Sequence, residues 1–351
     1  MTRSAAFLAL PLLLPTLAHA YGEATALGPS PEERALHFFT DQIRVEPDAN
    51  DPAFSNLPPV RPLVLNEDLN EAARFYADDM AENGCFPADH SSCDGTAFGE
   101  RVSSFYNGLP IAENIALGQP DAEFVVSNVN GWLYSDGHRG NMLSGQFNEL
   151  GPGFALGTQP LWVQDFGFRG GIEEPILTSA THWPLEGRTD DDLRFYTALY
   201  DPDGAPDEVK LVSVGACHEL ELDRGADGMS TWTTTAPTYE EGCMPYWFYV
   251  TTAGGETISY PTEGSLLAPI GGADCDVWTP NRSGADCAPS EVSGFQGSGG
   301  GCATTSEEYG PDANVGGDYE YGTCSLGARR PAPRSWLLVA LLGLGLRRRR
   351  R

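Results

Sequence analysis

The stretch from Ile111 to Met142 constrains the fold more than any other part of the chain. It opens with Glu113 among apolar neighbours, and a helix-like run follows. Apolar residues recur in this run at helical spacing: Phe124, Val125, Val129, Trp132 and Leu133. Gly137 is typical of the left-handed residue that ends a helix, and His138 follows it directly. The pattern predicts a carboxylate before a helix at 119–135 and an imidazole after it, both on irregular segments.

Other elements can be placed around this stretch. Ser30 and Pro31 are typical of a helix start, so a helix is expected to run to about Arg44. Further helices are expected at 66–83 and 97–106, and period-two alternation predicts a hairpin at 148–168.

Four motifs occur in a fixed order in this part of the chain. They are ARFYADDMAENG at 73–84, AENIA at 112–116, SDGHRGNM at 135–142 and LGPGFALG…LWVQDFG at 150–167. Together they resemble the CAP superfamily of cysteine-rich secretory, antigen 5 and pathogenesis-related proteins, and more closely its bacterial branch. The resemblance covers Pro31 to Gly167 and implies an α+β fold, with a three-layer α-β-α sandwich at 31–170.

The resemblance also implies a cleft that gathers His90, Glu113 and His138. The second glutamate of the family would fall near Ser135 or Asp136, so both are included among the cleft residues. Two imidazoles and a carboxylate are enough to hold Zn²⁺ or another divalent cation with an open water position. His90 and His138 are therefore candidate metal ligands, and both histidines together with Glu113 are the candidate catalytic residues if the cleft is that of an enzyme.

Simpler interpretations of the same residues stay open. A loop histidine such as His90 is often solvated, and His138 after a helix end would gain from the helix dipole. Glu113 beside apolar residues needs hydrogen bonds or a cation to offset its desolvation. A Ser135–His138 nucleophile and base is disfavoured, because three residues across a helix stop do not give an orienting geometry. The chain also contains no G-x-S-x-G, H-E-x-x-H or Walker sequence.

Charge and targeting signals restrict the compartment and the partners. Residues 1–20 combine Arg3, an apolar run and a small-x-small end, which is typical of a secretory signal peptide. Of the 21 basic residues, one lies in this segment and eight lie in 325–351, which leaves 12 against 49 acidic residues. Such a surface repels phosphate backbones, so no nucleic-acid partner is expected.

Eight cysteines without a C-x-x-C pair agree with an oxidising, exported setting. Three disulfides are predicted within single segments: Cys85–Cys93 around His90, Cys217–Cys243 and Cys275–Cys287. Cys302 and Cys324 either pair with each other or, if Cys324 is a processing site, leave Cys302 unpaired.

The second half of the chain has a different texture. Short strands separated by turn signals predict an all-β sandwich of immunoglobulin or fibronectin type at 172–270, acting as a spacer or a carbohydrate-binding module. Residues 271–333 are rich in Gly, Ser, Asp and Pro and predict a disordered linker.

Residues 334–351 hold an apolar run that is followed by five terminal arginines, and the run is shorter than the roughly 20 residues that span a bilayer. With Cys324 they resemble a myxosortase-type sorting signal of bacterial surface proteins, which implies cleavage near Cys324 and transient membrane contact.

The sequence therefore predicts an exported protein of the bacterial cell surface. Its cleft is expected to bind a cation, or a small polar, lipid or envelope ligand, without turnover. Two alternatives stay open: a metal-assisted extracellular hydrolase of peptide or glycan, and a structural surface protein with a vestigial cleft.

Overall fold

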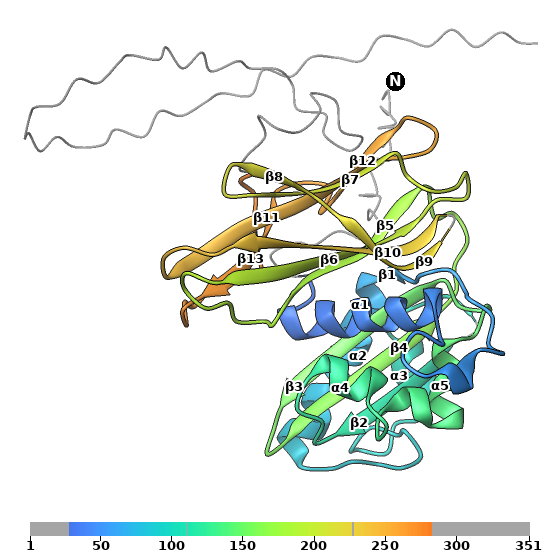
Figure 1. The fold of residues 1–351 in the computed structure, drawn as a ribbon. Coiled ribbons are helices and arrows are strands. Elements are labelled where there is room, and N and C mark those ends of the chain that lie inside the picture. Colours follow the sequence, from blue (N-terminus) through green and yellow to red (C-terminus); the bar gives the residue numbers. More distant parts are fainter. Residues whose placement is uncertain (1–27, 110, 227, 283–351) are drawn as a thin grey trace, which may run out of the picture. The chain divides into compact units, whose positions relative to one another are not determined.

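The computed structural model describes residues 28–109, 111–226 and 228–282 (Figure 1). The predicted signal peptide, most of the predicted linker and the C-terminal segment lie outside them, as do Cys287, Cys302 and Cys324. Within them the chain is a mixed helix and sheet structure, as expected. None of the helices in the described ranges is both long and apolar enough to cross a membrane.

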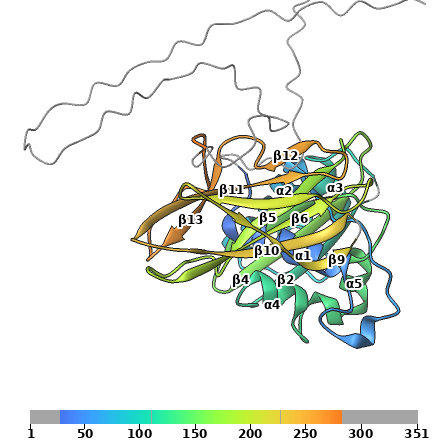
Figure 2. The same cartoon turned by 45° about the horizontal axis from the view of Figure 1, so that its top comes forward.

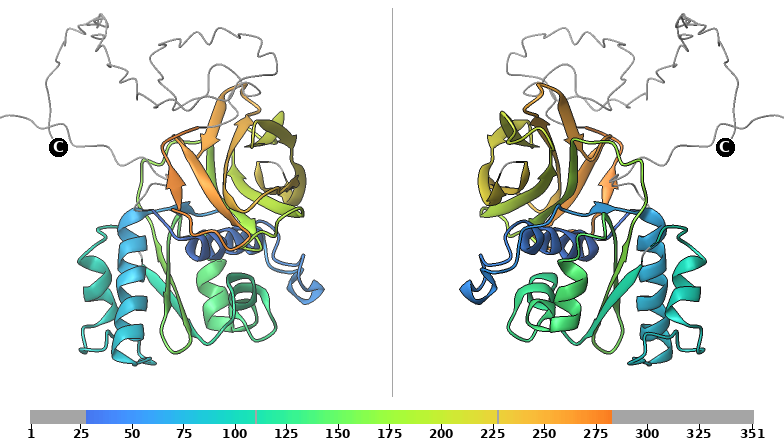
Figure 3. Two further views of the ribbon diagram at one scale, coloured as in Figure 1. Left: turned by 90° about the vertical axis from the view of Figure 1, so that its left-hand side faces the viewer. Right: turned by 90° about the vertical axis from the view of Figure 1, so that its right-hand side faces the viewer.

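The first sheet has the strand order β1-β3-β4-β2. Its strands are β1 (Val64–Leu65), β3 (Glu149–Leu156), β4 (Pro160–Gly167) and β2 (Ala112–Leu117). The β1–β3 pair is parallel, the other pairs are antiparallel, and β2 lies at an edge. Helix α2 (Glu67–Asn83) covers one face, and α3 (Phe98–Ser103) packs against α2 (Figure 3). Close approach of α2 requires glycine at Gly151, where a Cβ atom would lie 2.0 Å from the backbone of Leu69.

The other face of this sheet is covered by α1 (Pro31–Val45), α4 (Ala122–Ser127) and a short 3₁₀ turn at Trp132–Tyr134. Ser30 and Glu33 form a capping box at the start of α1, where the sequence predicts that a helix begins. The helix expected at 119–135 is wrong in extent: Asn128 is extended with ψ 155°, which ends α4, and Val129 is 66% exposed. A further helix, α5 (Asp136–Met142), follows the 3₁₀ turn.

Two more sheets follow in the chain. One has the order β5-β6-β10-β9, and the other has the order β14-β13-β11-β7-β8 with β12 paired to β11 (Figure 2). The strands of the first are β5 (Ile176–Trp183), β6 (Asp192–Tyr200), β10 (Met229–Pro237) and β9 (Glu221–Ala226). Those of the second are β7 (Glu208–Ser213), β8 (Ala216–Glu219), β11 (Gly242–Thr251), β12 (Thr257–Tyr260), β13 (Ser265–Ile270) and β14 (Trp278–Thr279). Apolar residues of both sheets, such as Phe195 and Phe248, share one core.

Helix α1 joins the first sheet to these later strands. Every residue from Glu33 to Val45 is buried, because β3 and α4 pack against one side of the helix and β5 and β10 against another (Figure 1). Asp41 accepts hydrogen bonds from the backbone of Leu63 at 2.8 Å and from Thr178 Oγ1 and Ser179 Oγ at 2.9 and 2.7 Å. Three donors surround this buried carboxylate, so its desolvation is offset.

Two of the predicted disulfides are wrong. Cys243 pairs with Cys275, with 5.7 Å between their Cα atoms, so neither Cys217–Cys243 nor Cys275–Cys287 forms. Cys217 lies on β8, which β7 separates from β11, and two strand spacings amount to about 9–10 Å. A disulfide does not bridge Cα atoms more than about 7 Å apart. Cys217 is disulfide-bonded too, but not to Cys243. Residues 278 and 279, which were predicted to lie in the linker, belong to β14 and pair with β13.

Candidate functional site

Glu113 lies on the edge strand β2, which corrects the expectation of an irregular segment. Strand alternation turns it toward the face of the sheet that α2 covers, on the same side as Ile115. Its side chain is 1% exposed. The next residue, Asn114, points to the opposite face, so the two polar residues of AENIA serve different faces of the sheet.

Both carboxylate oxygens of Glu113 are occupied by side chains of the same face. His90 Nδ1 donates to Oε1 at 2.7 Å, and the buried Arg101 guanidinium donates to Oε2. Arg101 also donates to the backbone carbonyl of His90 at 3.0 Å and lies 3.6 Å from the ring centroid of Tyr76. The structure therefore brings His90 and Glu113 together, and it adds Arg101 as the cation that offsets burial of the carboxylate.

The loop that carries His90 is held in an uncommon conformation. His90 has φ 62°, a region that few residues other than glycine adopt, and its side chain is 30% exposed. Cys85 and Cys93 close the loop, with 6.0 Å between their Cα atoms, and this is the pairing predicted from the sequence. Together with the Arg101 contact to its backbone, the disulfide fixes where His90 stands.

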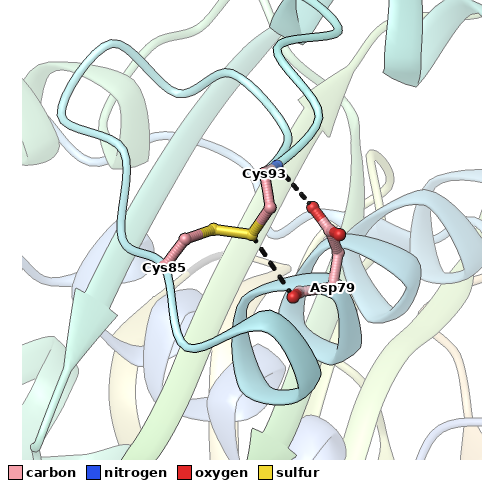
Figure 4. Close-up of side chains that lie close together, drawn as sticks. All are labelled: Asp79, Cys85 and Cys93. Carbon is pink, nitrogen blue, oxygen red and sulfur yellow. Dashed lines mark hydrogen bonds between the residues drawn. A yellow bond between two sulfur atoms is a disulfide. The ribbon is translucent and has the colours of Figure 1, made fainter.

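Asp79 packs against this disulfide (Figure 4). Its carboxylate accepts from the backbone of Cys93 at 2.7 Å. Asp79, Cys85 and Cys93 are the only group of three or more possible metal donors within 4.8 Å of one another in the described ranges. Metal binding requires a thiolate, and both sulfurs are in a disulfide, so this group stabilises the loop and holds no metal.

His138 lies inside α5, so the expectation that Gly137 ends a helix before it is wrong. Ser135 is the N-cap residue of α5, yet its side chain does not cap the helix. Instead, Ser135 Oγ lies 2.8 Å from His138 Nδ1. The helical turn brings residues three apart onto one face, so the two side chains meet where the sequence disfavoured an orienting contact.

The pKa of His138 is lowered from its ordinary value by burial and, to a smaller degree, by the charge of His90. The charge of His90 thus acts on His138, but the donor atoms of His90, Glu113 and His138 do not all lie within 4.8 Å of one another. A lowered pKa keeps His138 neutral at neutral pH, which is the form that binds a cation.

An amide network fixes the other side of β2. Asn114 Nδ2 donates to the backbone carbonyl of His138 at 3.2 Å and to Gln164 Oε1 at 3.0 Å. Asn141 Nδ2 donates to the carbonyl of Glu113 at 3.2 Å and to Asn114 Oδ1 at 2.9 Å. These bonds tie α5 to β2 and so set the position of His138 relative to Glu113.

Two acidic residues near Glu113 and His138 differ in placement: Asp136 was predicted to lie in the cleft, and Asp165 was not predicted to take part. Asp136 is 96% exposed and pairs with Arg139 at 2.5 Å, so it points to solvent. Asp165 was not singled out, yet it is fully buried and lies directly across from Glu113 in the β2–β4 register. The available signal was an acidic residue within the apolar alternation of LWVQDFG.

Residues 55–166 match the profile of the CAP family, the cysteine-rich secretory protein family. The protein YkwD of Bacillus subtilis is 34% identical over 108 residues, which are 30% of this chain and 40% of YkwD. This chain thus covers less than half the length of that relative.

Solved structures are similar at lower identity. An outer surface protein from Borrelia burgdorferi is 21% identical, and the match covers 40% of this chain and 96% of that one, with a TM-score of 0.31. Venom allergen-like protein 4 of Schistosoma mansoni is 16% identical over 43% of this chain and 97% of that one, with a TM-score of 0.30. A cysteine-rich secretory protein of Staphylococcus aureus is 17% identical over 39% of this chain and 38% of that one, with a TM-score of 0.28. The segment that holds His90, Glu113 and His138 is similar in sequence to the CAP family.

Proposed function

We propose that this chain is an exported cell-surface protein in which His90 and His138 bind a divalent cation or a small polar ligand without turnover. The observation that supports this proposal most strongly is the set of hydrogen bonds made by the two imidazole rings. Nδ1 of His90 is bonded to Glu113 and Nδ1 of His138 to Ser135. No described residue bonds to either Nε2 atom, and a carboxylate behind a histidine is a common support for a metal ligand.

The contacts of Glu113 favour binding over turnover. A general base must lie within hydrogen-bond reach of the proton that it removes. Both oxygens of Glu113 are already taken up by His90 and the buried Arg101. Glu113 therefore orients His90 and is itself not free to activate water.

The donor set suits a weakly held cation. Zinc sites in proteins use four protein ligands when structural and three when catalytic. Here the protein supplies two imidazole nitrogens, and among the described residues no third His, Cys, Asp or Glu donor completes such a group with them. Water or a polar ligand would fill the remaining positions, so ligand and cation would bind together.

One contact favours a second function, an extracellular hydrolase of peptide or glycan. Ser135 Oγ lies 2.8 Å from His138 Nδ1, within reach for activation of a hydroxyl by a neutral imidazole. Zinc binding and substrate turnover, measured on the same variants, distinguish the two functions.

Zinc titration of the mature full chain, followed by calorimetry, tests the proposal. We expect saturable binding that weakens at least tenfold in His90→Ala and in His138→Ala. Asp136→Asn is the matched control, since it removes one acidic group of the surface outside the site. A panel of peptides and glycans should show no turnover. Turnover that is lost in Ser135→Ala would establish the hydrolase, and absence of specific zinc binding would favour a vestigial cleft.

Export, anchoring and domain organisation belong to the same proposal. The signal-like segment at 1–20 and the disulfides Cys85–Cys93 and Cys243–Cys275 support export. We propose a three-layer α-β-α domain at 31–170, supported by helices on both faces of the first sheet, and an immunoglobulin- or fibronectin-like sandwich after it. Intact mass of the protein recovered from its source decides on cleavage near Cys324: retention of residues 325–351 would reject the sorting signal.

A further inference from the structure

Asp165 is a buried carboxyl group on the face of the first sheet that α2 covers. It is 0% exposed, and neither of its oxygens receives a hydrogen bond from any described residue. A carboxylate without donors in such a place is strongly disfavoured, so the group takes up a proton instead.

The neighbours of Asp165 come from four elements. β4 places it between Glu113 on β2 and Gly151 on β3, and α2 covers this face with Tyr76. Tyr76 carries no charge, because burial raises its pKa. Arg101 on α3 is the cation of the group, and its guanidinium is bonded to Glu113.

Among the described residues, the one permanent positive charge beside Glu113 and Asp165 is paired with Glu113. Arg101 offsets one carboxylate, and Glu113 is the one that it contacts. Glu149, further along β3, has its own partners: Arg169 Nε at 3.3 Å and Asn66 Nδ2 at 2.7 Å. A second negative charge beside Glu113 would therefore be both buried and unpaired.

We propose that Asp165 is a neutral carboxylic acid whose O–H donates a hydrogen bond to the Glu113 carboxylate, and that it thereby positions Glu113 for His90. Residues directly opposite each other on antiparallel strands have Cβ atoms about 4.5–5.5 Å apart, which lets two carboxyl groups meet. Glu113 then accepts from three donors: Asp165, Arg101 and His90. The pKa of Asp165 agrees with a neutral acid: it is raised well above its usual value, mainly by burial and then by the charge of Glu113.

The protonation state can be measured without reference to any ligand. In the full chain with ¹³C-labelled aspartate, Asp165→Asn identifies the Asp165 carboxyl resonance by its disappearance. We expect this resonance to keep the position of a protonated acid between about pH 5 and pH 8, whereas exposed carboxylates are ionised over this range. Asp89 is the internal control, because hydrogen bonds from Ser91 lower its pKa. A carboxylate position for Asp165 at neutral pH would overturn the proposal.

The positioning role rests on the proposed function and uses Zn²⁺ as the probe. Asp165→Asn keeps a donor toward Glu113, so we expect its zinc affinity to stay within about twofold of wild type. Asp165→Leu is similar in size but has no donor, and we expect about tenfold weaker binding, the lower end of the usual effect of losing an outer-shell partner.

Each outcome has a separate meaning. Equal zinc affinity of a folded Asp165→Leu protein would reject the positioning role, and so would a tenfold loss in Asp165→Asn. If the leucine variant does not fold, the asparagine variant and the resonance decide. If the wild type binds no zinc, the proposed function fails, and the resonance still decides whether Asp165 is neutral.

Discussion

His182, in the strands after residue 175, and the two histidines of the candidate site have different surroundings. In the strands after residue 175, His182 is fully buried, with Nδ1 2.9 Å from Tyr246 Oη and Nε2 3.0 Å from the carbonyl of Leu185. In the first region, His90 and His138 are partly exposed and each has one ring nitrogen engaged. His182 thus has both ring nitrogens engaged in the core, whereas His90 and His138 each have one ring nitrogen to which no described residue bonds.

The electrostatics separate the regions in the same way. Burial lowers the pKa of His182 to about 3, so its ring is neutral at neutral pH. The first region keeps a neutral acid, Asp165, whose pKa burial raises. Each region thus buries a titratable group in its uncharged form, but only Asp165 adjoins the candidate site.

The largest effect is expected from His182→Ala. The change leaves a cavity and removes the partners of Tyr246 Oη and of the Leu185 carbonyl, so it should lower the free energy of unfolding by roughly 3–4 kcal/mol. Urea unfolding at neutral pH measures this. Zinc affinity should be unchanged, and a variant that loses zinc binding while still folded would break the comparison between the two regions.

The sequence predicted the parts of this arrangement that local pattern encodes. The start of α1 followed from Ser30 and Pro31, and the β3–β4 hairpin followed from its alternation. The Cys85–Cys93 pairing followed from closeness in sequence. The CAP resemblance named His90, Glu113 and His138, and the contact between His90 and Glu113 agrees with it.

The parts that were missed depend on contacts distant in the chain. Asp165 matters only because the β2–β4 register places it opposite Glu113, 52 positions before it. Cys243 pairs with Cys275 because the strand order puts β13 beside β11 and β8 beyond β7. The sequence of a single segment predicts neither the strand order nor the register. Gly137 suggested a helix end, but the bonds of Asn114 and Asn141 hold α5 in place.

A second effect separates the regions by pH. The folded-state pKa of His182 lies below its ordinary value of 6.5, so its contribution to stability is full above pH 6.5 and is lost as pH falls toward about 3. Relative to His182→Gln, which does not titrate, the wild type should lose about 1.4 kcal/mol per pH unit in this window. Urea unfolding of both proteins at several pH values gives this difference, and parallel curves would show that His182 is not buried neutral.

Asp165 should show the opposite slope. Its folded-state pKa is raised above 3.8, so its contribution is full below pH 3.8 and is lost as pH rises from there. Asp165→Asn removes this loss, and its stability relative to wild type should rise by up to about 1.4 kcal/mol per pH unit above that value. Urea unfolding of wild type and Asp165→Asn at several pH values measures this difference in the free energy of unfolding. A constant difference between the two proteins would mean that Asp165 is ionised in the folded state.

A smaller effect is expected in the pH dependence of zinc affinity at His90 and His138. The pKa of His138 lies below 6.5 because of burial and the charge of His90, so its ring stays neutral at pH 7 and becomes protonated only in more acidic solution. A protonated imidazole cannot bind a cation, so zinc affinity should fall by about tenfold per pH unit once the pH drops below the pKa of His138. Calorimetric titrations across this range in wild type and in His138→Ala, which should have a shallower dependence, provide the check.

The smallest effect is expected at Asp136, and it tests how the candidate site is bounded. The resemblance placed Asp136 in the cleft, but its side chain is 96% exposed and pairs with Arg139 on the surface of α5. Exposed ion pairs contribute little to stability, because solvent screens them and both side chains lose freedom. Asp136→Asn should therefore leave the unfolding midpoint unchanged within error and zinc affinity within about twofold of wild type, the usual scatter for a surface substitution. A tenfold loss of zinc affinity in this variant, with His182→Ala still binding normally, would extend the site to the start of α5 and require a second carboxylate beside His138.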